Sequence, residues 1–199
     1  MSRRNIGVAV EVPEPFGREL QGWRERLGDP NATAIVPHVT LLAPTAVAPE
    51  SLAAIEEHLL AVARAERPFE IELRGSATFR PVSPVVFVPL VRGISECERL
   101  EARIRSGPLA RPTRFNYHPH VTVAHDLPDP ALDRAYCELA GFSARFPVRG
   151  FSLFEQGGDG VWRPQRDVIF GSGGFPGPPE RTVLAPEPAE YPDPREEDW

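Results

Sequence analysis

Pro37-His38-Val39-Thr40-Leu41 and Pro119-His120-Val121-Thr122-Val123 are two closely matching stretches, and their histidines lie 82 positions apart. In a β-strand, side chains at i and i+2 share a face. The imidazole and the hydroxyl of each His-x-Thr triplet would therefore project together, while the valine between them points into the opposite layer. Two such strands placed side by side would form a cleft that contains two imidazoles and two hydroxyls.

This set of groups suits in-line attack at phosphorus. One histidine would act as the base and the other as the acid, while the hydroxyls hold phosphate oxygens. We therefore take His38 and His120 as candidate catalytic residues, and Thr40 and Thr122 as candidate substrate-binding residues. A single His-x-Thr triplet would more often be structural. Two triplets with matching flanks favour catalysis, although the sequence does not say which histidine is the base.

The charge of the chain is unevenly distributed. The net charge of the 199 residues is −6, and 28 acidic residues face 22 basic ones, all of them Arg. Residues 172–199 hold seven acidic residues and two Arg, which leaves 21 and 20 for residues 1–171. The first part is thus nearly neutral and lacks the broad basic surface that grips long duplexes. A nucleic-acid ligand should be short and held locally.

Composition also indicates the class of protein. The hydrophobic fraction of 41% allows a folded domain, which we assign to residues 1–171, whereas the acidic, proline-rich residues 172–199 are predicted to be disordered. No apolar run reaches the roughly 18 residues of a membrane span, and the N-terminus does not resemble a signal peptide. We expect a cytoplasmic monomer, with Cys97 and Cys137 as buried free thiols.

The periodicity of apolar residues predicts an α+β fold in two similar halves. Each half runs through a strand, a helix, a His-x-Thr strand, a helix and further strands, so we expect two pseudo-symmetric lobes of mostly antiparallel sheet, with helices outside and a central cleft. The expected strands are 6–12, 34–43, 69–73, 85–90 and 118–125, the helices are 16–27, 50–66, 94–104 and 129–139, and the arms of a final hairpin are 142–155 and 161–171.

The two His-x-Thr stretches and this order of elements resemble the 2H phosphoesterase superfamily. Within it, the chain is similar to the bacterial 2′-5′ RNA ligase-like branch, the RNA 2′,3′-cyclic phosphodiesterases, over residues 5–171. The resemblance implies a bilobal fold, a water-filled central cleft, and neither metal nor cofactor. It also implies that His38 and His120 are the acid/base pair and that Thr40 and Thr122 bind phosphate.

One position departs from the pattern of the branch. Its members often carry Arg three positions after the second Thr, where this chain has His125. A permanently charged guanidinium is thus exchanged for an imidazole, which gains and loses charge near neutral pH. We keep His125 as a candidate substrate-binding residue, together with Tyr117, whose ring could stack on a base.

The resemblance implies hydrolysis of a 2′,3′-cyclic phosphate on an RNA end or nucleotide, and the reverse reaction would join ends through a 2′-5′ bond. One alternative is a non-catalytic module that binds RNA ends or nucleotides on the same fold. Another is a scaffold protein whose acidic tail binds a partner.

The sequence offers further candidate site residues. Phe79, Arg80 and Phe115 could clamp a base and its phosphate, and Arg114 and Arg166 could face the cleft. His118, His120 and His125 could suggest a metal site, but no Cys or acidic cluster lies nearby to complete it, so we expect no metal.

Overall fold

The structure, a computed structural model, describes residues 3–113 and 115–171. Within these residues, four α-helices cover one curled antiparallel sheet of nine strands, so the predicted α+β class is confirmed. The helices are α1 (Phe16–Leu27), α2 (Leu52–Arg64), α3 (Ile94–Ile104) and α4 (Asp129–Glu138). The strands are β1 (Arg4–Glu11), β2 (His38–Val47), β3 (Phe69–Arg74), β4 (Ala77–Thr78), β5 (Val85–Arg92), β6 (His120–His125), β7 (Ser143–Val148), β8 (Gly150–Gln156) and β9 (Trp162–Ile169).

The sheet order is β7-β3-β5-β6-β2-β1-β8-β9, with β4 paired to β5. The two His-x-Thr strands, β6 and β2, are thus neighbours at its centre, and β5 and β1 flank them. This arrangement places equivalent strands of the two sequence halves on either side of one central line. The predicted pseudo-symmetric lobes therefore exist, and they share a single sheet.

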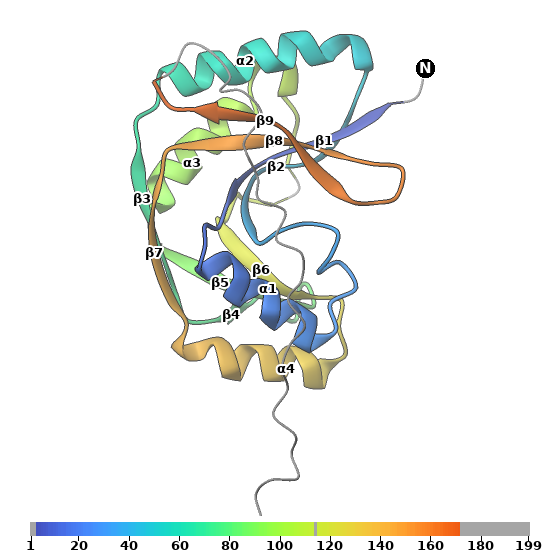
Figure 1. Cartoon of the computed structure of the whole chain (residues 1–199), viewed down its shortest axis with the longest axis vertical. Helices are drawn as coiled ribbons and strands as arrows, with labels where there is room; N and C mark the ends of the chain where they lie inside the picture. The colour runs from blue at the N-terminus through green and yellow to red at the C-terminus, as the bar shows by residue number, and fades with distance from the viewer. Residues whose placement is uncertain (1–2, 114, 172–199) are drawn as a thin grey trace, which may run out of the picture.

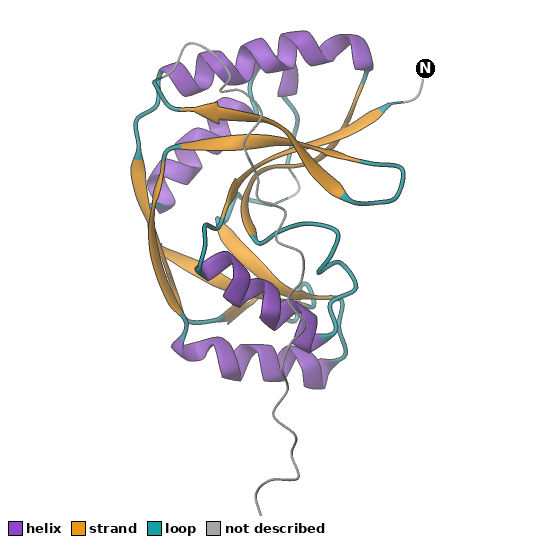
Figure 2. Ribbon diagram, in the orientation of Figure 1, coloured by secondary structure: helices purple, strands orange, loops and turns teal. Residues whose placement is uncertain are grey.

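The helices lie on the outside of the two lobes (Figure 2). Figure 1 shows α2 along one end of the molecule, above β1, β2, β8 and β9, and α1 and α4 at the other end beside β5 and β6. The helices that follow β1 and β5 both cross to the other lobe, because α1 packs on β6 and α3 packs on β2. Each lobe is therefore covered partly by a helix from the other half of the chain.

A buried ion pair shapes the loop that leads into β2. Arg24 of α1 is 5% exposed and its Nε donates to Asp29 at 2.9 Å, while another guanidinium nitrogen donates to the carbonyl of Asn31 at 2.8 Å. A third bond from Arg24 reaches the carbonyl of Ile35. The start of β2 is also tied to β1, because the Val12 N–H donates to the Pro37 carbonyl at 3.0 Å. Together these bonds hold the position at which His38 enters the sheet.

Two expectations from the sequence are confirmed only in part. The final hairpin exists, because β8 pairs with β9, but its first arm begins only at Gly150. The preceding strand β7 pairs with β3 at the other edge of the sheet. The apolar alternation continues across the turn between these strands, so it does not reveal the change of partner. Cys97 is a buried free thiol as expected, but Cys137 is exposed.

Gly150, at the turn between β7 and β8, has no room for a side chain. A Cβ at this position would lie 2.1 Å from the Val168 carbonyl oxygen and 3.1 Å from the Ile169 Cα, which are backbone atoms of β9. A side chain at residue 150 would therefore push the backbone of β9 away from β8.

We expect Gly150→Ala to destabilise the fold by ~1–3 kcal/mol, since the backbone of β9 must move to admit the methyl group. Gly158→Ala is the matched control, because a Cβ at Gly158 has no heavy atom within 4 Å, and it should change stability by less than about 0.5 kcal/mol. Urea unfolding measures both variants. Equal stabilities for the two would contradict the close approach at Gly150.

Candidate active site

The two His-x-Thr triplets meet at the middle of the sheet. Val39 of β2 pairs with Val121 of β6, and both valine side chains are 0% exposed. The strands run antiparallel, so one step from this pair brings His38 to the side of Thr122 and His120 to the side of Thr40. Because side chains alternate along a strand, these four groups face away from the buried valines.

Each of the two imidazoles is held by the same local contact. His38 Nδ1 lies 2.7 Å from the carbonyl oxygen of Val36, and His120 Nδ1 lies 2.7 Å from the carbonyl oxygen of His118. A carbonyl oxygen can only accept, so Nδ1 carries the proton and donates. Nε2 of each neutral ring is thereby left as a proton acceptor, and it becomes a donor once protonated.

The environment lowers the pKa of both histidines. Burial is the main cause for each ring, and the bond to the preceding carbonyl opposes it. The positive charge of Arg24 and that of His120 further lower the pKa of His38, while His118 lowers that of His120. His38 is not among the groups that shift the pKa of His120. In the free protein at neutral pH, both imidazoles are therefore mainly neutral.

A cleft of about 780 Å³ opens over β6 and β2. Its walls include five of the six predicted site residues, namely Thr40, Tyr117, His120, Thr122 and His125. The sixth, His38, is half-buried and does not line this cleft; it lies at the start of β2, where it pairs with Glu11 of β1. The structure thus brings the predicted residues together, with His38 on the β1 side of the group.

Two of these residues have partners within the protein. The Tyr117 hydroxyl donates to the Thr40 carbonyl at 2.9 Å, and burial raises the pKa of Tyr117, so this hydroxyl keeps its proton. Tyr117 therefore steadies the strand that carries Thr40, while its ring lines the cleft. His125 is exposed, and its Nε2 lies 3.4 Å from a carboxylate oxygen of Asp126.

An aromatic cluster supports His120. The Phe79 and His120 rings pack edge to face, with 5.1 Å between their centroids. The centroid of the Phe87 ring lies 4.9 Å from that of His120. Phe79 also packs on Phe87 at 4.2 Å. Phe79 and Phe115, which the sequence suggested as base contacts, both line the cleft.

Several charged residues fall in unexpected places. Arg80 does not line the cleft but pairs with Asp133 at 2.7 Å and Asp129 at 3.6 Å on α4. Arg166 lies 3.5 Å from Glu56 of α2, outside the cleft. Arg114 lies outside the described residues.

Sequence reasoning missed a charged wall of the cleft. Glu101 of α3 is 5% exposed and accepts from Arg105, whose guanidinium also donates to the Arg111 carbonyl at 3.1 Å. Arg111 in turn donates to the carbonyl of Ala43 at 2.9 Å. The i,i+4 spacing of Glu101 and Arg105 was visible in the sequence, but nothing local showed that this helical face borders the cleft.

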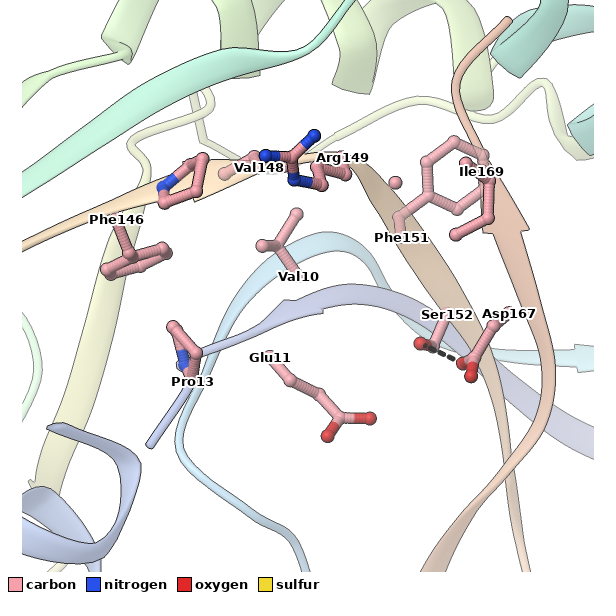
Figure 3. A pocket seen from close by; sticks show the side chains of 12 residues that line it. Val10, Glu11, Pro13, Phe146, Val148, Arg149, Phe151, Ser152, Asp167 and Ile169 are labelled. Carbon is pink, nitrogen blue, oxygen red and sulfur yellow. Dashed lines mark hydrogen bonds between the residues drawn. The ribbon is translucent and has the colours of Figure 1, made fainter. Parts of the chain in front are cut away.

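A second, smaller cavity of about 220 Å³ lies between β1, β9 and the turn from β7 to β8. Figure 3 shows the side chains that line it, among them Glu11 and the pair in which the Ser152 hydroxyl donates to Asp167 at 2.6 Å. None of its lining residues belongs to either His-x-Thr triplet. The larger cleft is therefore the candidate active site.

Among residues 3–113 and 115–171, no group of three or more His, Cys, Asp or Glu side chains is arranged to hold a metal ion. Within the same residues, no helix is both long and apolar enough to cross a bilayer.

A family model described as the 2'-5' RNA ligase superfamily matches residues 12–160, a span that includes both His-x-Thr triplets. The chain belongs to this superfamily. It is accordingly a phosphoesterase of the 2H type, and the family suggested by the sequence is confirmed.

Relatives and solved structures agree with this membership. A Halalkalibacterium halodurans protein with the provisional name of a phosphoesterase is 30% identical over 123 residues, which cover 62% of this chain and 71% of the relative. A similarly named Geobacillus kaustophilus protein is 26% identical over 167 residues, which cover 83% of this chain and 95% of the relative.

Crystal structures of E. coli LigT have the same fold. LigT complexed with phosphate has a TM-score of 0.62 at 21% identity, and it covers 85% of this chain and 99% of that one. LigT complexed with 3'-AMP has a TM-score of 0.64 at 19% identity, and the match covers 84% of this chain and 98% of LigT. At these identities the likeness shows a shared fold.

We expect NMR titration of the imidazole Cε1–H signals to give midpoints below ~6.5 for both His38 and His120, because burial disfavours their charged forms. The unfolded chain binds these two protons at a higher pH than the folded protein does. The free energy of unfolding should therefore decrease as the pH falls below about 6.5. A midpoint at or above 6.5 for either ring would contradict the described burial.

Proposed function

We propose that this protein is a metal-independent phosphodiesterase that hydrolyses 2′,3′-cyclic phosphates on RNA ends or nucleotides. The observation that carries the proposal is the matched pair of imidazoles. Each donates from Nδ1 to a carbonyl and keeps Nε2 for proton transfer, on adjacent strands joined at Val39 and Val121. A cytoplasmic location and a monomeric state belong to the same proposal.

The reaction needs a water in line with the leaving ribose oxygen and a proton for that oxygen. One neutral imidazole takes a proton from the water through Nε2 as the new P–O bond forms. The other imidazole, protonated, gives its Nε2 proton to the ribose oxygen as the old P–O bond breaks. The hydroxyls of Thr40 and Thr122 donate to the non-bridging phosphate oxygens, where negative charge develops.

The lowered pKa values of the two histidines fit this scheme. An unprotonated imidazole is ready to act as the base at neutral pH, and the negative charge of a bound phosphate raises the pKa of the ring that must act as the acid. Substrate binding would thus help to place one proton on the pair. The reverse reaction would use the same two groups to join RNA ends through a 2′-5′ bond.

The cleft supports a nucleotide-sized ligand. Its volume of about 780 Å³ lies within the usual range for small-molecule sites, and aromatic side chains line it. LigT, which shares the fold, has been crystallised with phosphate, 3'-AMP, NADP+ and ATP. These complexes favour a ligand that carries phosphate and a nucleoside.

We expect His38→Ala and His120→Ala each to lower kcat for a 2′,3′-cyclic nucleotide by about 10²–10⁴-fold, since each variant loses one proton transfer. Turnover of the parent protein should be unchanged in EDTA. His58→Gln serves as the control, because His58 lies on α2 outside the cleft.

Turnover within a few-fold of the parent in either alanine variant would contradict the proposed roles. Binding of the cyclic nucleotide without any turnover by the parent protein would support the alternative, a binding module on the same fold. Product analysis on cyclic substrates of different length then identifies the preferred substrate.

A further inference from the structure

His118 is a third imidazole in the active-site cleft. It precedes His120 by two residues, and both side chains line the cleft together with Thr122, so the spacing of two continues beyond the triplet. Its side chain is exposed, whereas that of His120 is half-buried. The sequence alone suggested only a polar residue at the start of a strand.

The His118 ring is held in place although it is exposed. It packs edge to face on Phe79 at 5.7 Å and on Phe87 at 5.6 Å, and it stacks on the His120 ring at 6.1 Å with 25° between the planes. No hydrogen bond joins its ring nitrogens to another described residue. The orientation of the ring is therefore set by packing, which leaves both nitrogens for a ligand.

The charged groups around this part of the cleft are of both signs. His125 lies on the same strand as His120, and Arg111 lies on the loop before Tyr117. The carboxylate of Glu101 on α3 is paired with Arg105, and Arg111 is bonded to backbone carbonyls. An anion near His120 would thus find the His118 ring beside it, stacked at 6.1 Å between ring centroids.

We propose that protonated His118 binds an oxygen of the substrate phosphate beside His120, and that its charge keeps His120 in the proton-accepting form. This inference rests on the proposed function, because it names a further phosphate-binding residue of the same site. The stacking of His118 on His120 supports the proposed effect of its charge. His118 is also among the groups that lower the pKa of His120.

The test measures binding of inorganic phosphate by NMR titration at pH 6 and pH 8.5, which does not depend on turnover. We expect His118→Gln to weaken phosphate binding by about tenfold at pH 6 and by less than about twofold at pH 8.5, because a neutral ring contributes little. The pKa of His120 should rise in the same variant, since a repelling charge is removed.

His118→Lys separates charge from packing. It should bind phosphate within about twofold of the parent at pH 6 and more tightly than the parent at pH 8.5, because an ammonium group keeps its charge there. His125→Gln is the control for the pKa measurement on His120. It should leave that pKa unchanged, because the His125 ring does not stack on the His120 ring.

Unchanged phosphate affinity at pH 6 in His118→Gln, or an unmoved pKa of His120, would overturn the inference. Either result would leave the proposed function standing, since that function depends on the loss of turnover in the His38 and His120 variants. A loss of turnover in those variants, with His118→Gln indistinguishable from the parent, would show that only two imidazoles act on the phosphate.

Discussion

The pairing of Val39 with Val121 is the contact on which the site depends. Both side chains are fully buried, so the sheet cannot slip by one residue without moving a valine into the cleft and a histidine into the core. The apolar layer below the sheet thereby sets the direction of every polar group above it. The two triplets are therefore held in register by hydrophobic packing of the valines between their functional groups.

A second constraint acts within each triplet. The carbonyl two residues before each histidine accepts from Nδ1, and a proline stands between them in both cases. Proline keeps the preceding residue extended, which favours one direction for its carbonyl. The same short sequence thus specifies the strand, the orientation of the ring and the nitrogen that stays free.

Burial and exposure then divide the imidazoles. His38 and His120 are half-buried and their pKa values are lowered, as suits groups that exchange protons near neutral pH. His118 and His125 are exposed at the surface of the cleft. Arg24 contributes at a distance, because its bonds hold the loop before β2 and its guanidinium lowers the pKa of His38.

The sequence by itself determined the α+β class, most of the helices and strands, and the two triplets, because each depends on local spacing. Helix α1 runs from Phe16 to Leu27 as its apolar spacing predicts, and Gly28 ends it in a left-handed conformation. Only the tertiary structure decided that β2 and β6 are neighbours, that β7 and β8 part at Gly150, and that Glu101, Arg105 and His118 border the cleft. These features depend on which distant apolar faces pack together, and periodicity along one segment carries no record of its partner in space.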